Sequence, residues 1–121
     1  MKNEIDVYGI KNVNFTIIDE EDDRWDEFKK QRIERGFDDS ELWNLDYTIA
    51  KFIYPRLKAF SENIIGYPPT MTCEDWEDIL KTMVKAFEYI IEGEIDISKE
   101  KQDVVSKGLN YFKEYFFNLW N

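Results

Sequence analysis

Apolar positions recur at intervals of three or four residues along most of the chain, which is the spacing of one face of an α-helix. The first strong stretch, residues 41–63, carries Leu45, Ile49, Phe52, Ile53, Leu57 and Phe60. The second, residues 73–93, carries Trp76, Ile79, Leu80, Met83, Phe87, Ile90 and Ile91. The third, residues 98–120, carries Val105, Leu109, Phe112, Phe116 and Leu119, widened by Tyr111, Tyr115 and Trp120. These patterns predict three amphipathic helices.

A weaker helix is predicted over residues 23–35, where few apolar residues share a face. Asp22 or Asp23 could cap its start, because a short side-chain oxygen can accept a bond from the first free N–H groups. Gly36 suits its end, because glycine adopts the left-handed conformation that stops many helices.

Cap signals also mark the three strong helices. Asp38, followed three residues later by Glu41, resembles a capping box at the start of the helix over residues 41–63. Thr72 is expected to cap the next helix, and Asp96 or Ser98 the last one.

Pro55 lies inside the first apolar stripe. It removes the hydrogen bond to the Lys51 carbonyl and clashes with it, which costs ~3 kcal/mol in a helix interior. The stripe nevertheless continues in phase on both sides of the proline. This continuity favours a single kinked core helix over two unrelated helices.

The segment "VNFTII", residues 13–18, has the β-branched and aromatic content of a strand. It could pair with residues 5–10 as a hairpin, or pack as an extended arm on the helices or on another chain. The expected fold is therefore mostly α, a small helical bundle of about four helices with an N-terminal extended arm or β-hairpin. We expect a single domain over residues 1–121, with the arm or hairpin in residues 1–21 and the bundle in residues 22–121.

Charge is the main compositional signal. The chain has 26 acidic and 16 basic residues, a net charge of -10. It should repel nucleic acid but could attract a basic protein surface. Two acidic faces are candidates for partner binding, although solubility and helix-dipole compensation are the simpler explanation of both. The candidate residues are Asp19, Glu20, Glu21, Asp22 and Asp23 on one face, and Glu74, Asp75 and Asp78 on the other.

Several kinds of chemistry are disfavoured. The chain has no histidine, so it lacks the usual neutral-pH proton shuttle and the commonest metal ligand. Cys73 is the only cysteine, and without histidine it has no ordinary catalytic partner. No phosphate-binding glycine loop, CxxC pair or GxSxG motif occurs. We expect a non-enzymatic protein without cofactor or metal.

A basic cluster near Pro55 is a candidate ligand site. Arg56 and Lys58, with Tyr54 nearby, could hold a nucleotide by pairing with phosphate and stacking on a base. They would be reinforced if the helix carrying Lys29, Lys30, Arg32 and Arg35 packed alongside.

Part of the sequence resembles a known family. The blocks "RGFDDSELWNLDYTIAKFIYPRLKAF", "GYPP", "EDWEDILKTMVKAFE" and "GLNYFKEYFFNLW", in this order over residues 35–120, resemble uncharacterised small proteins of tailed bacteriophages and prophages. The resemblance implies a phage gene product but no activity and no functional residues.

Together, charge and resemblance favour a phage accessory protein that binds and antagonises a host defence or nucleic-acid enzyme, in the manner of an anti-CRISPR protein. The expected partner is a host protein with a basic surface. The alternatives are a structural or regulatory phage protein that self-associates, possible as a homo-oligomer, and a nucleotide-signal sponge. No long apolar span or signal-like N-terminus occurs, so we expect no membrane partner and a location in the host cytoplasm.

Overall fold

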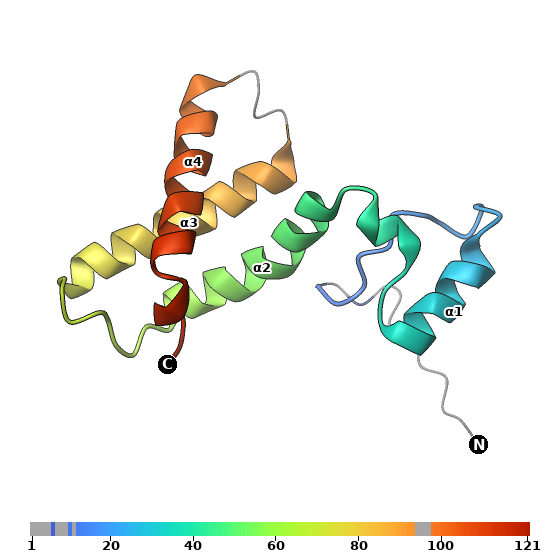
Figure 1. The fold of residues 1–121 in the computed structure, drawn as a ribbon, viewed down its shortest axis with the longest axis horizontal. Coiled ribbons are helices and arrows are strands. Elements are labelled where there is room, and N and C mark those ends of the chain that lie inside the picture. The colour runs from blue at the N-terminus through green and yellow to red at the C-terminus, as the bar shows by residue number, and fades with distance from the viewer. Residues whose placement is uncertain (1–5, 7–9, 11, 94–97) are drawn as a thin grey trace. The chain divides into compact units, whose positions relative to one another are not determined.

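A computed structural model describes residues 6, 10, 12–93 and 98–121. Its elements are, in chain order, α1 (Trp25–Arg35), the 3-10 helix η1 (Asp39–Leu42), α2 (Leu45–Glu62), α3 (Cys73–Glu92), α4 (Lys99–Glu114) and the 3-10 helix η3 (Phe116–Asn118) (Figure 1). This confirms the predicted fold class, a small and mostly α-helical bundle. None of the residues described belongs to a strand, so residues 13–18 form no hairpin strand, and most of the expected partner segment, residues 5–10, lies outside the described residues.

The chain divides into two compact units. The N-terminal unit is Met1–Phe52 and the C-terminal unit is Ile53–Asn121. α2 runs from the first into the second and continues through Pro55, as the unbroken stripe predicted. The single-domain organisation stays a prediction.

The two ends of α1 differ in how well the sequence predicted them. Gly36 adopts a left-handed φ of 87° and its N–H donates to the carbonyl of Arg32 at 2.8 Å, as expected for a helix stop. The predicted cap by Asp22 or Asp23 is wrong, because Arg24 holds the cap position without a side-chain bond. Asp22 instead accepts the backbone N–H of Arg24 at 2.9 Å.

Three predicted caps are present. Asp38 and Glu41 form a capping box, but it begins η1, and α2 starts three residues after η1 ends. Thr72 forms a capping box with Asp75 at the start of α3. Ser98 caps α4 by accepting the N–H of Lys101 at 3.3 Å, while Asp96 lies outside the described residues. Local side-chain chemistry therefore fixes where these helices begin.

The core of the C-terminal unit lies between α3 and α4, which cross in contact with each other (Figure 1). Gly108 allows the close approach, because a Cβ at this position would overlap the Cβ of Ala86 and lie 2.8 Å from the Thr82 carbonyl oxygen. The face of α3 that the sequence predicted is largely the buried one. The buried α3 residues are Trp76, Ile79, Leu80, Met83, Ala86 and Phe87.

Two expectations about apolar stripes are corrected. The first half of the α2 stripe is exposed rather than core: Leu45, Ile49 and Phe52 have exposed fractions of 49%, 53% and 47%, whereas Leu57 is buried. The last helix is shorter than its pattern, because α4 ends at Glu114 and the chain continues as η3. In the first case the apolar residues keep the helical spacing but are not buried. In the second case the spacing continues beyond the end of the helix.

Candidate protein-binding surface

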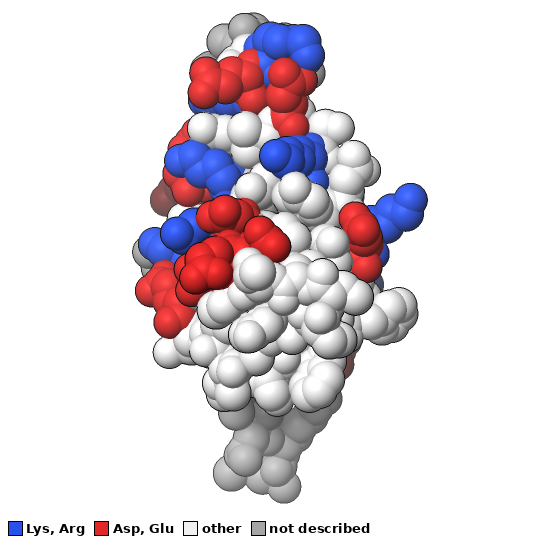
Figure 2. Space-filling view, turned by 90° about the vertical axis from the view of Figure 1, so that its left-hand side faces the viewer, with Lys and Arg blue, Asp and Glu red and all other residues white. Residues whose placement is uncertain are grey.

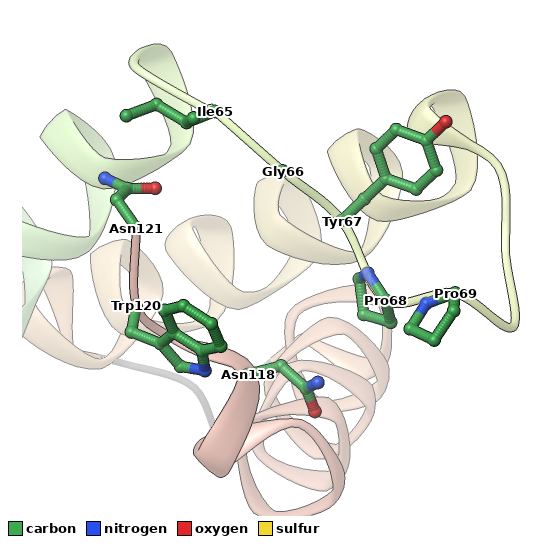
Figure 3. Close-up of a pocket in the computed structure, with 8 residues that line it drawn as sticks. All are labelled: Ile65, Gly66, Tyr67, Pro68, Pro69, Asn118, Trp120 and Asn121. Atoms are coloured by element: carbon green, nitrogen blue, oxygen red, sulfur yellow. The ribbon is translucent and has the colours of Figure 1, made fainter.

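An apolar hollow of about 270 Å³ opens in the C-terminal unit where the loop between α2 and α3 meets the last residues of the chain (Figure 3). The loop contains Pro68 and Pro69, which cannot donate the backbone bonds of a helix and so favour an irregular path. After α4, the short η3 turns the chain so that Asn118 and Trp120 line the hollow with the loop. The lining residues are Ile65, Gly66, Tyr67, Pro68, Pro69, Asn118, Trp120 and Asn121.

Large apolar side chains around this hollow are unusually exposed. The exposed fractions are 81% for Ile65, 53% for Tyr67 and 75% for Trp120, all of which line it. Soluble proteins tolerate scattered apolar residues on the surface, but contiguous apolar patches commonly mark interaction sites. The gathering of these side chains at one end of the C-terminal unit therefore marks a candidate binding surface.

A series of ring contacts joins the end of the chain to the core. Phe87 on α3 packs edge-to-face on Phe112, Phe112 on Phe116, and Phe116 on Phe117, with ring centroids 5.2 to 5.5 Å apart. Edge-to-face pairs at this spacing add stability beyond the area they bury. The exposed aromatics of η3 therefore extend from a packed framework.

The same loop also lines a second, polar hollow of about 440 Å³, since Pro69 lines the first hollow and the next residue, Thr70, lines the second. Two carboxylates, two phenol rings and one ammonium face it. The lining residues are Thr70, Met71, Asp75, Asp78, Ile79, Thr82, Lys107, Tyr111 and Tyr115. Such a lining suits a cationic group more than an anion, because carboxylates outnumber the ammonium and phenol faces also attract cations.

Two residues of the predicted acidic face on α3, Asp75 and Asp78, line the polar hollow. Glu74, Asp75 and Asp78 are all exposed, and none of the salt bridges between described residues involves them. Asp75 also has a structural role, since it accepts a hydrogen bond from the backbone N–H of Thr72 in the capping box. Figure 2 shows acidic side chains above a broad area without charged side chains on one side of the molecule. The structure thus places the charges predicted from sequence next to an apolar patch that was not predicted.

The other predicted acidic face, residues 19–23, belongs to the N-terminal unit. Asp19, Glu20, Glu21 and Asp23 are exposed. Asp22 is engaged locally, because both of its oxygens accept from the Arg24 guanidinium at 2.9 Å, and these bonds lower its pKa to about 2. This face keeps four carboxylates available to a partner.

The predicted ligand residues lie on α2 within the C-terminal unit. Arg56 and Lys58 are exposed, and the Tyr54 hydroxyl donates to Glu88 at 3.4 Å. Residues four apart on a helix share a face whereas residues two apart do not. Tyr54 and Lys58 are therefore neighbours, but Arg56 points to another side of α2. Nucleotide binding at these three residues stays a prediction.

Two of the four basic residues of α1, Arg32 and Arg35, form ion pairs within the N-terminal unit. Arg32 is buried and donates to Asp38 at 2.6 Å and to Asp6 at 2.9 Å. Arg35, on the surface, donates to Asp39 at 2.7 Å. Arg32 thus joins α1 to η1 as part of the fold, and the sequence analysis missed this pair because its carboxylates lie on other segments.

The buried polar cluster around Arg32 also holds the segment before α1. Ser40 accepts the backbone N–H of Ile17 at 3.1 Å and lies 3.2 Å from the Thr16 hydroxyl. Burial alone would raise the pKa of Asp38, but hydrogen bonds from Ser40, Thr16 and Arg32 outweigh it and lower that pKa. Burial raises the pKa of Glu41, and hydrogen bonds from the backbone N–H groups of Asp38 and Phe15 with the charge of Arg32 only partly oppose this rise. The cluster is a buried charge network of the kind that fixes one arrangement of chain segments.

Cys73 has no feature of an activated nucleophile. Burial and the nearby Glu77 carboxylate raise the pKa of its thiol, which donates weakly to that carboxylate at 3.7 Å. Reactive cysteines instead have lowered pKa values beside cationic groups. Across the described part of the chain, no three acidic or cysteine side chains gather as a metal site.

Neither a known protein family, a curated protein nor a solved structure matches this chain, so the resemblance to phage proteins stays a prediction. No described helix has the length and apolar content needed to cross a membrane.

Proposed function

We propose that the protein is a non-enzymatic bacteriophage protein that binds a host protein with a basic surface and so antagonises a defence or nucleic-acid enzyme. The observation that carries this proposal is that one loop of the C-terminal unit lines both an apolar hollow and a polar hollow with the carboxylates of Asp75 and Asp78, near the exposed Glu74 at the same helix start. Protein interfaces commonly combine an apolar centre with a polar or charged rim.

The charge of the whole chain supports the same class of partner. A net charge of -10 gives the molecule a field that accelerates its encounter with a basic surface and disfavours direct contact with nucleic acid. Surfaces that hold nucleic acid are basic for the same electrostatic reason. An acidic protein with an apolar anchor can occupy such a surface in place of the nucleic acid.

The test begins with the full chain immobilised and exposed to lysate from phage-infected bacteria, followed by identification and purification of the captured protein. Binding of that protein is then measured with Glu74→Lys combined with Asp78→Lys, which leaves the Asp75 cap in place. The matched control is Glu100→Lys combined with Asp103→Lys on α4, which makes the same change in charge at another helix start.

We expect the α3 variant to bind about tenfold or more weakly, because reversed rim charges repel a basic partner. The α4 control variant should lose much less binding affinity. A further variant reverses the four exposed carboxylates of residues 19–23. Binding that survives reversal at both acidic faces would contradict the proposal.

Self-association is a second candidate, favoured by the exposed half of the α2 stripe, Leu45, Ile49 and Phe52. A helix that exposes an apolar stripe can bury it against a copy of itself. Light scattering at increasing protein concentration tests this candidate directly: a mass that stays monomeric at high concentration would exclude it, whereas a dimer sensitive to Ile49→Glu would support it.

A further inference from the structure

We propose that the apolar hollow of the C-terminal unit docks an extended segment of the partner protein, in which a large apolar side chain lies close to a lysine or arginine. This inference rests on the proposed function and deepens it by stating what the partner presents to the hollow.

The size and lining of the hollow favour a side chain over a free small molecule. Its volume, about 270 Å³, is below the range of roughly 300–1,000 Å³ typical of small-molecule sites. Trp120 from the chain end and Tyr67 from the loop supply large rings that lose little conformational freedom on binding, and Pro68 with Pro69 stiffens the loop that faces Trp120 (Figure 3). Aromatic side chains in this setting are the usual anchors of protein interfaces.

The neighbouring polar hollow decides the charge of the occupant. Among the described residues, Asp75 and Asp78 bring two carboxylates to its lining and Lys107 brings one ammonium. The rings of Tyr111 and Tyr115 line the same space, and phenol faces attract ammonium and guanidinium groups. A basic side chain next to the apolar anchor would therefore find both opposite charge and aromatic surface.

The same charges disfavour a second copy of this chain as the occupant. In a symmetric dimer the same patch is used on both subunits, so carboxylates beside the hollow would approach their own copies. Like charges across an interface are destabilising. A basic segment of a different protein avoids this repulsion.

The order of the two hollows along the loop suits an extended segment. Residues 65–69 line the apolar hollow and residues 70–71 line the polar one. Side chains of an extended chain alternate in direction, so alternate residues of one segment can enter neighbouring depressions.

The experiment measures fluorescence polarisation of three labelled synthetic peptides with the full chain. The first peptide carries tryptophan and leucine among lysines, the second replaces the tryptophan and leucine by alanine, and the third replaces the lysines by glutamate. We expect the first to bind most tightly, with each replacement lowering affinity by about tenfold.

Variants then locate the site. Trp120→Ala and Tyr67→Ala should each lower affinity for the first peptide by about tenfold. Phe117→Ala is the matched control, because Phe117 is an exposed aromatic of the same chain end that does not line the hollow, and it should change affinity by no more than about twofold. Trp120 is three-quarters exposed, so thermal unfolding should be unchanged by its substitution.

The outcomes separate this inference from the proposed function. Equal binding of the first and second peptides, unaffected by Trp120→Ala, would overturn the docking hollow while leaving an acidic protein that binds basic chains. Equal binding of the lysine and glutamate peptides would contradict the electrostatic basis of the proposed function itself. Absence of binding by all three peptides, or an equal loss with Phe117→Ala, would also overturn the hollow.

Discussion

At the scale of single residues, Arg32 and Asp38 depend on each other. Both side chains are buried, with exposed fractions of 3% and 0%, and their charged atoms lie 2.6 Å apart. Arg32→Met is expected to lower the free energy of unfolding by about 3–5 kcal/mol, because it leaves the Asp38 carboxylate buried without its counter-charge. Urea denaturation followed by circular dichroism measures the loss.

Lys30→Met is the matched control for this prediction, since Lys30 is an exposed base on the same helix. It should change the free energy of unfolding by no more than about 0.5 kcal/mol. An Arg32→Met loss as small as that of the control would show that the buried pair contributes little.

The raised pKa of Glu41 predicts that the free energy of unfolding changes with pH in the direction opposite to the change expected from Asp38. Burial raises the pKa of Glu41 above the ordinary value of 4.5, so between 4.5 and the raised value the folded state binds more protons than the unfolded state. Stability from this group therefore increases as pH falls through that window. Asp38 has a lowered pKa, so its contribution is fully present above its ordinary value of 3.8 and is lost only below that value, outside the window.

Glu41→Gln tests this dependence, because glutamine can accept the same hydrogen bond from the Asp38 N–H without a charge. We expect the wild-type free energy of unfolding, relative to the variant, to rise as pH falls from neutral toward 4.5. Denaturation at a series of pH values measures this difference, with exposed Glu34→Gln as control. A difference that stays constant with pH would contradict the assignment.

At the scale of elements, the crossing of α3 and α4 depends on Gly108. Gly108→Ala would place a Cβ against Ala86 and 2.8 Å from the Thr82 carbonyl, and backbone cannot move aside cheaply. We expect a loss of about 1–3 kcal/mol from overpacking, despite the better helix propensity of alanine. Thermal unfolding measures this loss of stability. The control is Ser106→Ala at an exposed position of the same helix, which should leave stability unchanged or raise it. Equal stability of the Gly108→Ala and Ser106→Ala variants would mean that α3 and α4 can move apart to accommodate the added Cβ at little cost in free energy.

The elements also show what the sequence could predict. The local pattern of the sequence could predict the caps at Thr72 and Ser98 and the helix stop at Gly36, because each depends on residues only a few positions away. The exposure of Ile49 could not be predicted, because helical spacing indicates an apolar face without indicating whether another element covers it. The acidic face on α3 could be predicted from the sequence alone. The hollow could not, because it forms only where residues 65–69 lie close to Trp120 in the fold, and no local sequence signal indicates this contact.

At the scale of the whole molecule, charge and apolar anchoring should act on different rate constants. Rim charges influence the long-range encounter and hence the association rate, whereas a packed aromatic influences how long the complex lasts. The net charge of -10 is therefore expected to influence how quickly the proposed basic partner is found, and Trp120 how firmly it is held. The two contributions are separable by kinetics even though both change the equilibrium affinity.

Stopped-flow measurement with the tryptophan–lysine peptide tests this separation. Raising the salt concentration from roughly 0.01 to 0.15 M shortens the Debye length from about 30 to 8 Å and should slow association severalfold while changing dissociation little. Glu74→Lys combined with Asp78→Lys should slow association and weaken its salt dependence. Trp120→Ala should instead speed dissociation and leave the salt dependence of association intact. A Trp120→Ala variant that dissociates at the wild-type rate would place the anchor elsewhere, because burial of the indole in the complex is what the hollow is proposed to supply.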